Sequence, residues 1–310
     1  MSAAYDIVVA GSGIAGLTAA LTAARLGRKT LLLTGDVLGG QLLSINHIDG
    51  YPGFPEGIAG YDLCPMTQEQ AQAAGAEFAG TELERLAPRD GQWLVGTAAG
   101  EEHAARAVIL ATGARLKELG VPGEARLFGK GVSHCASCDA PMLRERVAAV
   151  VGGGDSAAQE ALTVAETAAR VILIHRGAAL AAQASYRDQV LANPRIEPRF
   201  NTVVEEIAGA ERVTGIRLRD GSGAAAGLDV SAVFIYIGLQ PNSAVAAGVL
   251  ALDASGRIPT DGAMRTVARG ICAAGAVRSG WLGRAAVSAG DGAAAAIAAD
   301  RYIGSDEWPT

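Results

Sequence analysis

Residues 6–16 read DIVVAGSGIAG, a short apolar run that leads into three glycines. Residues 6–10 have the length and composition of a buried strand, and residues 14–26 have the pattern of a helix. A second strand is expected at residues 29–33. Glycines at a strand-to-helix turn let the backbone approach a pyrophosphate, which then lies at the helix N-terminus. This stretch therefore predicts a βαβ unit that binds a dinucleotide.

The same arrangement recurs in the middle of the chain. An apolar run at residues 147–151 is followed by GGGDSA at residues 152–157. Residues 156–168 have the pattern of a helix, and residues 170–174 that of the next strand. A chain of 310 residues is long enough for two α/β domains, each with its own core. Two fingerprints therefore predict two nucleotide-binding domains.

Between the two fingerprints lies CASCD, residues 135–139. A CxxC pair closes a disulfide with little chain movement, and a position ahead of a helix lowers a thiol pKa. We expect Pro141 to be the first helical residue, which would place Cys138 close to the helix N-terminus. Asp139 is placed to give or take the proton when thiolate and thiol interconvert. A structural metal needs further Cys or His ligands, which His134 alone does not supply, so no metal site is expected.

The composition limits the class of protein. A formal charge of −6 and a pI near 5.3 argue against a nucleic-acid partner. Cys64 and Cys272 stand alone in apolar surroundings, so the cysteines are typical of a reducing compartment. Residues 7–24 are uncharged but interrupted by glycines, and no Lys or Arg precedes Arg25. We expect a cytoplasmic, soluble protein with no membrane partner.

Beyond these motifs, the chain resembles the low-molecular-weight thioredoxin reductase family over nearly its whole length. The matching segments, in the expected order, are GGQL (39–42), YPGFP (51–55), ATGA (111–114), CASCD (135–139), GGGDS (152–156), HR (175–176), IGLQPN (237–242) and AAG (273–275). The resemblance implies an α/β fold with two Rossmann-like, three-layer nucleotide-binding domains, one inserted in the other. It places FAD in residues 1–115 and 243–310, and NAD(P)H in residues 116–242, which carry the CxxC pair.

The resemblance also implies an activity. NADPH would reduce FAD, FAD would reduce the Cys135–Cys138 pair, and the dithiol would reduce thioredoxin or a small thioredoxin-like protein. A homodimer is implied as well, with Cys135, Cys138 and Asp139 as the catalytic residues. The residues implied at FAD are Gly11, Ser12, Gly13, Ala15, Gly16, Thr34, Gly40, Gln41, Leu42, Thr112, Gly113, Gly275, Val277, Arg284 and Ala285. Those implied at NADPH are Gly152, Gly154, Asp155, Ser156, His175 and Arg176.

The nicotinamide site departs from the family pattern. The strand after the second fingerprint ends at His175 and Arg176, with no acidic residue for a ribose 2′-hydroxyl, and a cation there favours the 2′-phosphate of NADP. Gly177 and Ala181 stand where the family has further arginines, and Arg187 is a candidate replacement. NADPH is the expected cofactor, and NADH remains open.

The flavin site departs at two positions. Ala276 stands where the family has an Asp, and losing a buried charged hydrogen bond costs on the order of 1.5–3 kcal/mol if nothing replaces it. Arg284 stands where the family has Gln. A guanidinium beside the flavin pyrimidine edge would favour the anionic reduced flavin, whereas an Arg284 that points to solvent would not.

Three other activities remain open on the sequence alone. A dithiol oxidase of this fold would pass electrons from a small dithiol to O₂. It would tolerate a nicotinamide site that has fewer arginines than the family pattern. A related reductase would receive electrons from ferredoxin. A non-catalytic flavoprotein, acting as a redox sensor or assembly partner, would have no need of Cys135, Cys138 and Asp139 together.

Overall fold

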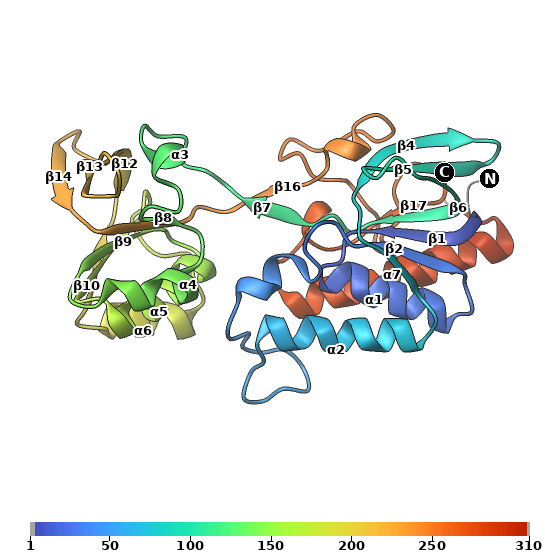
Figure 1. The fold of residues 1–310 in the computed structure, drawn as a ribbon, viewed down its shortest axis with the longest axis horizontal. Helices are drawn as coiled ribbons and strands as arrows, with labels where there is room; N and C mark the ends of the chain where they lie inside the picture. Colours follow the sequence, from blue (N-terminus) through green and yellow to red (C-terminus); the bar gives the residue numbers. More distant parts are fainter. Residues whose placement is uncertain (1–3, 309–310) are drawn as a thin grey trace. The chain divides into compact units, whose positions relative to one another are not determined.

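The computed structural model describes residues 4–308, and the chain forms two compact units. The discontinuous unit comprises Met1–Arg115 and Gln240–Thr310, and the inserted unit comprises Leu116–Leu239. The chain crosses between them at β7 (Ala114–Leu116) and β16 (Leu239–Pro241), which pair as a two-stranded sheet (Figure 1). The predicted α/β class, with one nucleotide-binding domain inserted in another, is confirmed.

The discontinuous unit is built on a seven-stranded sheet of order β3-β2-β1-β6-β5-β4, with β17 paired to β6. Its strands are β1 (Ala4–Ala10), β2 (Thr30–Leu33), β3 (Glu77–Ala79), β4 (Leu83–Arg89), β5 (Gln92–Thr97), β6 (Glu102–Leu110) and β17 (Ile271–Ala273). β3, β2, β1, β6 and β17 are parallel, whereas β5 and β4 are antiparallel to their neighbours. The carboxyl ends of β1, β2, β6 and β17 therefore meet at one edge, where nucleotides bind in such sheets.

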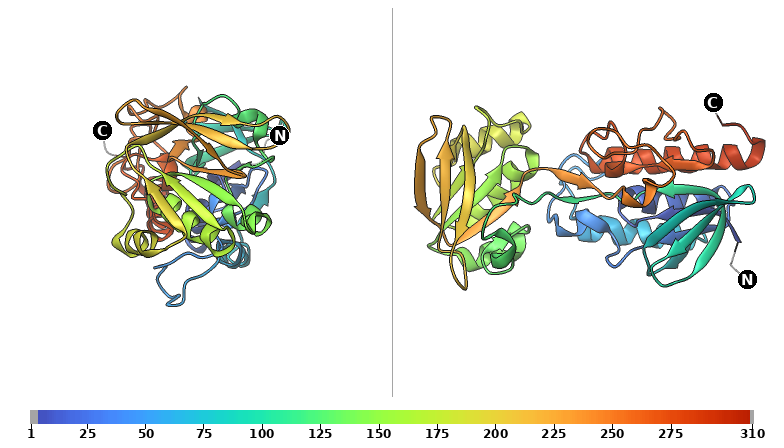
Figure 2. Two further views of the ribbon diagram at one scale, coloured as in Figure 1. Left: turned by 90° about the vertical axis from the view of Figure 1, so that its left-hand side faces the viewer. Right: turned by 90° about the horizontal axis from the view of Figure 1, so that it is seen from above.

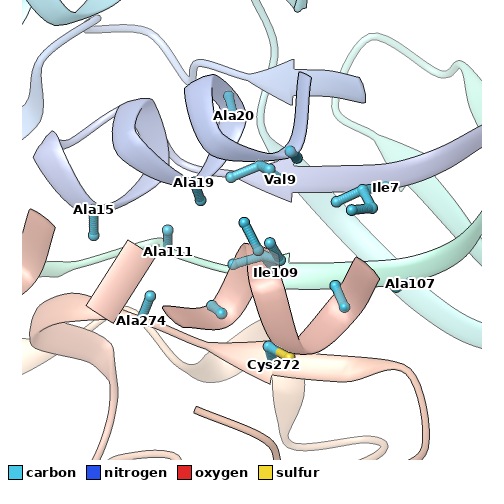
Figure 3. Close-up of a cluster of buried hydrophobic side chains, with 14 of the residues drawn as sticks. Ile7, Val9, Ala15, Ala19, Ala20, Ala107, Ile109, Ala111, Cys272 and Ala274 are labelled. Carbon is cyan, nitrogen blue, oxygen red and sulfur yellow. The ribbon is translucent and has the colours of Figure 1, made fainter. Parts of the chain in front are cut away.

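Helices cover one face of this sheet. They are α1 (Ile14–Arg25), α2 (Gly60–Ala73) and α7 (Ala285–Ser305), with short 3-10 turns η1 (Gly40–Ser44), η3 (Ala244–Ala246) and η4 (Gly275–Val277) elsewhere in the unit. Ile7, Val9 and Ile109 point into the core beneath them (Figure 3). α1 and α7 cross closely because small residues line both helices. A Cβ on Gly292 would lie 2.0 Å from the carbonyl oxygen of Ala15.

The opposite face of the sheet is covered by β structure and a loop. Val8, Leu33 and Val108 pack there against Leu86 of β4 and Val95 of β5. Since strand residues alternate between faces, β1 supplies Ile7 and Val9 to one core and Val8 to the other. This two-sided burial explains why the strand is almost uniformly apolar.

The inserted unit has a five-stranded parallel sheet of order β11-β10-β9-β15-β8. These strands are β8 (Val132–Ser133), β9 (Val147–Gly152), β10 (Arg170–Ile174), β11 (Ile196–Arg199) and β15 (Ala232–Tyr236). An antiparallel sheet comprises β12 (Thr202–Ala208), β13 (Gly215–Asp220) and β14 (Ala225–Asp229). The helices are α3 (Glu124–Leu127), α4 (Ala136–Asp139), α5 (Asp155–Thr167) and α6 (Ala184–Ala192), with the 3-10 turn η2 (Ala140–Leu143).

The inserted unit is therefore also three layers deep (Figures 1 and 2). Val150 and Leu173 face a core shared with α5, and Val151 and Ile172 face a core shared with the antiparallel sheet. No helix within residues 4–308 has the length and apolar character needed to cross a bilayer.

Candidate active site and cofactor sites

The first fingerprint forms the turn between β1 and α1. Gly11 has φ +104°, a conformation open to glycine but strained for other residues. A Cβ on Gly11 would lie 2.4 Å from the carbonyl oxygen of Ala111, and one on Gly16 would lie 1.7 Å from the carbonyl oxygen of Gly11. Both positions must be glycine because backbone passes directly over them.

Gly13 has a different role. It is the N-cap of α1, no side chain caps the helix there, and no acidic residue lies in the first turn. A Cβ on Gly13 would meet no atom within 4 Å. The first backbone N–H groups of a helix need partners from outside it, and a phosphate supplies them. The turn therefore fits the pyrophosphate of a dinucleotide.

Other predicted flavin residues gather at the same edge of the sheet. The Ser12 hydroxyl donates to the Thr34 carbonyl at 2.7 Å, and the Ser12 carbonyl accepts from the N–H of Gly39 at 3.1 Å. A Cβ on Gly40 would lie 3.4 Å from the Cα of Gly13. These contacts bring the end of β2 and the start of η1, with Gln41 and Leu42, beside the fingerprint.

Two further segments complete this edge. The Thr112 hydroxyl donates to the Asn242 carbonyl at 2.7 Å, and the Asn242 amide donates to the Thr112 carbonyl at 3.0 Å. A Cβ on Gly275, at the start of η4 with Val277, would lie 2.9 Å from the Cβ of Ala15. Arg284 is the exposed N-cap of α7 and Ala285 is its first residue.

A buried ion pair supports the η4 turn, and the sequence did not point to it. Arg278 Nε donates to Asp291 Oδ2 at 2.7 Å, and its Nη2 donates to Oδ1 at 2.8 Å. The N–H of Gly275 also donates to Asp291 Oδ2, at 3.1 Å. The side chains are 13% and 6% exposed. At Ala276, which stands where the family pattern has an Asp, the backbone carbonyl accepts from the Arg257 guanidinium. Charged side chains from elsewhere therefore hold this turn.

Replacing Asp291 with Asn is expected to lower the free energy of unfolding by about 3 kcal/mol, because Arg278 would stay buried without its counter-charge. Thermal unfolding of the flavin-free protein measures the effect. Asp188→Asn is the matched control, since Asp188 forms an exposed pair with Arg187 that is worth at most about 1 kcal/mol. Equal melting temperatures for the two variants would contradict the assigned role.

The second fingerprint forms the turn between β9 and α5. A Cβ on Gly152 would lie 2.2 Å from the Tyr236 carbonyl oxygen, and one on Gly153 would lie 2.2 Å from His175 Nδ1. Gly154 is the N-cap of α5, no side chain caps the helix there, and a Cβ on Gly154 would meet nothing within 4 Å. This turn also fits a phosphate, and it places Asp155 and Ser156 in the first turn of the helix.

A set of cationic side chains lies close to the second fingerprint. His175 and Arg176 directly follow β10, and Arg176 is exposed. The N–H of Ala181 donates to the Gly153 carbonyl at 2.8 Å, so this alanine lies beside the fingerprint where the family pattern has an arginine. Arg187 Nε donates to Asp188 Oδ1 at 3.2 Å. Arg187 thus forms an exposed ion pair with Asp188 in the structure.

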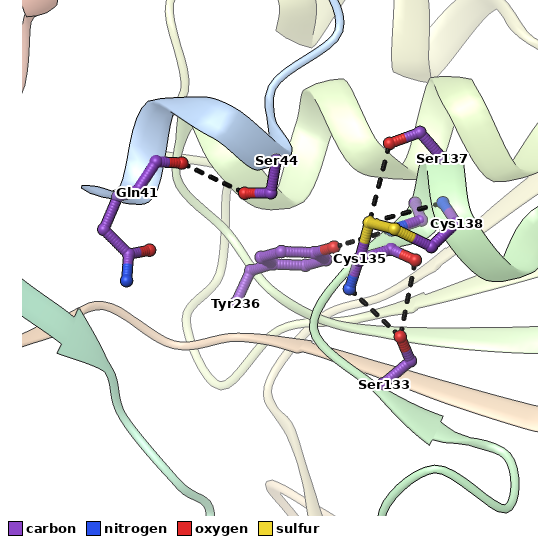
Figure 4. Close-up of a disulfide and its surroundings, with 8 residues drawn as sticks. Gln41, Ser44, Ser133, Cys135, Ser137, Cys138 and Tyr236 are labelled. Atoms are coloured by element: carbon purple, nitrogen blue, oxygen red, sulfur yellow. Dashed lines mark hydrogen bonds between the residues drawn. A yellow bond between two sulfur atoms is a disulfide. The ribbon is translucent and has the colours of Figure 1, made fainter. Parts of the chain in front are cut away.

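Cys135 and Cys138 form a disulfide at the carboxyl end of β8 (Figure 4). The N–H of Cys138 donates to Cys135 Sγ at 3.3 Å, and the N–H of Cys135 donates to Ser133 Oγ at 3.0 Å. Cys138 is exposed and Cys135 is half-buried. The disulfide and the second fingerprint therefore lie at the same edge of the inserted sheet.

The expected helix start at Pro141 is wrong. α4 begins at Ala136 with Cys135 as its N-cap, and Pro141 lies in η2. The sulfur of Cys135 accepts the N–H that a Ser or Asp side chain usually accepts at this position. Cys135, rather than Cys138, is therefore the sulfur that a backbone N–H stabilises.

Two titratable residues flank the dithiol. Asp139 ends α4, half-buried, and its N–H donates to the Cys135 carbonyl at 3.3 Å. Burial lowers the pKa of His134, against the opposing effect of Glu124 and Glu118. The His134 ring lies 5.5 Å from that of Phe128, edge to face.

Behind the disulfide lies a pair that the sequence did not indicate. The N–H of Ala136 donates to Tyr236 Oη at 3.2 Å, and the side chain of Glu160 hydrogen-bonds both Tyr236 and the Ala136 backbone. Burial raises the pKa of Glu160 to about 7, although these hydrogen bonds act in the opposite direction. Available clues were a tyrosine at the end of a buried strand and a carboxyl among the buried alanines of α5.

The remaining cysteines are buried and free, as expected. Burial raises the pKa of Cys64 to about 11, and it raises the pKa of Cys272 as well. Neither thiol forms a thiolate readily, so thiol chemistry is confined to Cys135 and Cys138.

Comparison with known proteins agrees with this geometry. Residues 5–292 match the family model described as pyridine nucleotide-disulphide oxidoreductase. A thioredoxin reductase of Treponema pallidum is 38% identical over 304 residues, which cover 98% of each chain. One of Mycolicibacterium smegmatis is 39% identical over 305 residues, again with 98% of each chain covered.

A solved structure gives the same result. The crystal structure of Lactococcus lactis thioredoxin reductase superposes with a TM-score of 0.93 at 34% identity, covering 96% of this chain and 99% of that one.

Proposed function

The chain belongs to the pyridine nucleotide-disulphide oxidoreductase family, and we propose that it carries electrons from NADPH through FAD to the Cys135–Cys138 disulfide and on to thioredoxin or a thioredoxin-like protein. It is a thioredoxin reductase-like flavoprotein disulfide reductase, an oxidoreductase that acts on a sulfur group. The observation that carries the proposal is a disulfide at the same sheet edge as a nucleotide fingerprint. Bound FAD would accept two electrons from the nicotinamide and supply them to the disulfide.

The protein's own residues then perform thiol–disulfide exchange. Cys138 is the exposed sulfur, so it loses its proton and then attacks the partner disulfide as a thiolate, which forms a mixed disulfide. The thiolate of Cys135, stabilised by the N–H of Cys138, attacks Cys138, releases the reduced partner and restores the Cys135–Cys138 disulfide. Asp139, the residue after Cys138, is the group that would pass a proton to the leaving partner thiolate.

Anaerobic mixing tests the first half of this reaction. The FAD-loaded protein should lose its flavin absorbance with NADPH, and added disulfide-form thioredoxin should restore it. A flavin that stays oxidised with both NADPH and NADH would contradict the proposal. Hydrogen peroxide produced from a small dithiol and O₂ without nicotinamide would instead support the dithiol oxidase, which the loss of arginines at Gly177 and Ala181 favours.

Arg176→Ala is expected to raise the KM for NADPH about tenfold or more and to leave the KM for NADH unchanged, because it removes a cation available to the 2′-phosphate. Steady-state kinetics with both cofactors measure this. Arg187→Ala is the control, since Arg187 is paired with Asp188. A larger NADPH effect at position 187 than at position 176 would reassign the phosphate contact.

The homodimer stays a prediction, which analytical ultracentrifugation of the FAD-loaded protein checks. The cytoplasmic location also stays a prediction, which fractionation of cells that produce the protein would test.

A further inference from the structure

Glu160 and Tyr236 lie behind the disulfide and have no part in the exchange chemistry described above. Glu160 lies on α5, Tyr236 ends β15, and both meet the N–H of Ala136, the residue that follows Cys135. Figure 4 shows the Tyr236 ring pointing toward the disulfide. A carboxyl group is thus joined, directly and through one phenol, to the peptide that follows Cys135.

We propose that Glu160, positioned by Tyr236, takes up a proton when the Cys135–Cys138 disulfide is reduced and releases it when the disulfide re-forms. This inference rests on the proposed function, because it concerns the same dithiol. Both residues act through the Ala136 peptide and are therefore positioning residues.

The electrons and protons of the disulfide reduction balance. Two electrons break the S–S bond and give two thiolates. One proton converts Cys138 to a thiol, and a second neutralises the Glu160 carboxylate, so that one negative charge remains, on Cys135. Reduction therefore exchanges the charge on Glu160 for a charge on Cys135. Two anions at this site would raise the energy of both, which is why the carboxylate takes the proton.

Among the groups around the disulfide, Glu160 is the one whose protonation changes when the disulfide is reduced. Burial already raises its pKa to about 7, so it changes charge in the range where the dithiol works. Burial and the nearby Glu160 charge raise the pKa of Tyr236, which keeps its proton. Asp139 on α4 also faces Tyr236. Neither β9 nor η2 carries a charged residue. The neighbouring elements β10, β11 and α6 hold their charges in surface pairs: Arg170–Glu197, Arg199–Glu197 and Arg187–Asp188.

The test is the pH dependence of the disulfide midpoint potential in the full chain. The protein is equilibrated in reduced and oxidised dithiothreitol between pH 5.5 and 9, and Cys135 and Cys138 are counted by alkylation and mass spectrometry. Above the Glu160 pKa, proton uptake adds about a tenfold change in the dithiol–disulfide equilibrium per pH unit, which is about 30 mV for this couple. We expect Glu160→Gln to remove this added slope and Tyr236→Phe to move its onset to higher pH.

Glu166→Gln is the matched control, because Glu166 is an exposed carboxylate on the same helix, and it should keep the wild-type profile. An unchanged slope in Glu160→Gln, or an equal change in Glu166→Gln, would overturn the inference. A merely structural role for Glu160 would change the melting temperature without changing the slope. If Glu160→Gln does not fold, the Tyr236→Phe variant supplies the test. In that variant, an added slope that begins at the same pH as in the wild type would reject the inference. The assay uses no nicotinamide and no flavin reduction, so the proposed function can fail separately.

Discussion

Cys135→Ser is expected to trap the partner as a stable mixed disulfide on Cys138, whereas Cys138→Ser is expected to trap nothing. Cys138 is exposed and forms the first bond to the partner, and Cys135 is the sulfur that breaks it. Without a resolving thiolate the covalent complex persists. In both variants, turnover with the partner should fall by at least about 10³-fold, because the dithiol acts as one unit.

Non-reducing electrophoresis and intact-mass measurement detect the complex after incubation of each reduced variant with disulfide-form thioredoxin. Flavin reduction by NADPH serves as the internal control, since it does not require the cysteines. A covalent complex formed by Cys138→Ser and not by Cys135→Ser would reverse the two roles. Rapid turnover in either variant would show that the disulfide lies outside the electron path.

Gly16→Ala is expected to prevent the discontinuous unit from folding. The added Cβ would lie 1.7 Å from the carbonyl oxygen of Gly11, and a backbone atom cannot move aside as a flexible side chain does. Overpacking a well-packed core costs about 1–3 kcal/mol when the surroundings relax, and this contact requires the β1–α1 turn itself to move. We expect a loss of more than about 4 kcal/mol, enough to unfold a marginally stable domain.

Gly13→Ala separates packing from cofactor binding at the same turn. Its Cβ would meet no protein atom within 4 Å, so the flavin-free protein should keep its wild-type melting temperature and far-UV circular dichroism. The methyl group would occupy space that a pyrophosphate approaches, and FAD affinity measured by fluorescence should fall by about tenfold or more. Wild-type FAD affinity in Gly13→Ala, or wild-type stability in Gly16→Ala, would contradict this assignment of the glycines.

Much of the fold was predictable because the decisive signals are local. The strand, turn and helix at residues 4–25 follow from apolar runs and from glycines whose Cβ positions are blocked by backbone. The antiparallel strands β4 and β5 were not predicted. Most of β4 is exposed, with Leu86 as its single buried residue, and it contains Pro88, so it shows no clear alternation.

The disulfide was predictable because Cys135 and Cys138 are neighbours in sequence. Glu160, Tyr236 and Asp291 were missed because their partners are far along the chain. The N–H of Ala136 meets a side chain 100 residues away. The start of α4 was misplaced for a different reason, since a cysteine that caps a helix with its own sulfur leaves no standard capping residue to read.

The burial of Cys64 and Cys272 gives the protein a chemical selectivity of its own. An electrophile that is selective for thiols finds two reactive thiols on the reduced protein, since the other two thiols are shielded and protonated. Oxidation of thiols is thereby directed to a pair that can close into a reversible disulfide. A fluorescent maleimide would accordingly report the redox state of the Cys135–Cys138 pair, with two labels per reduced chain and without the need to mutate any cysteine.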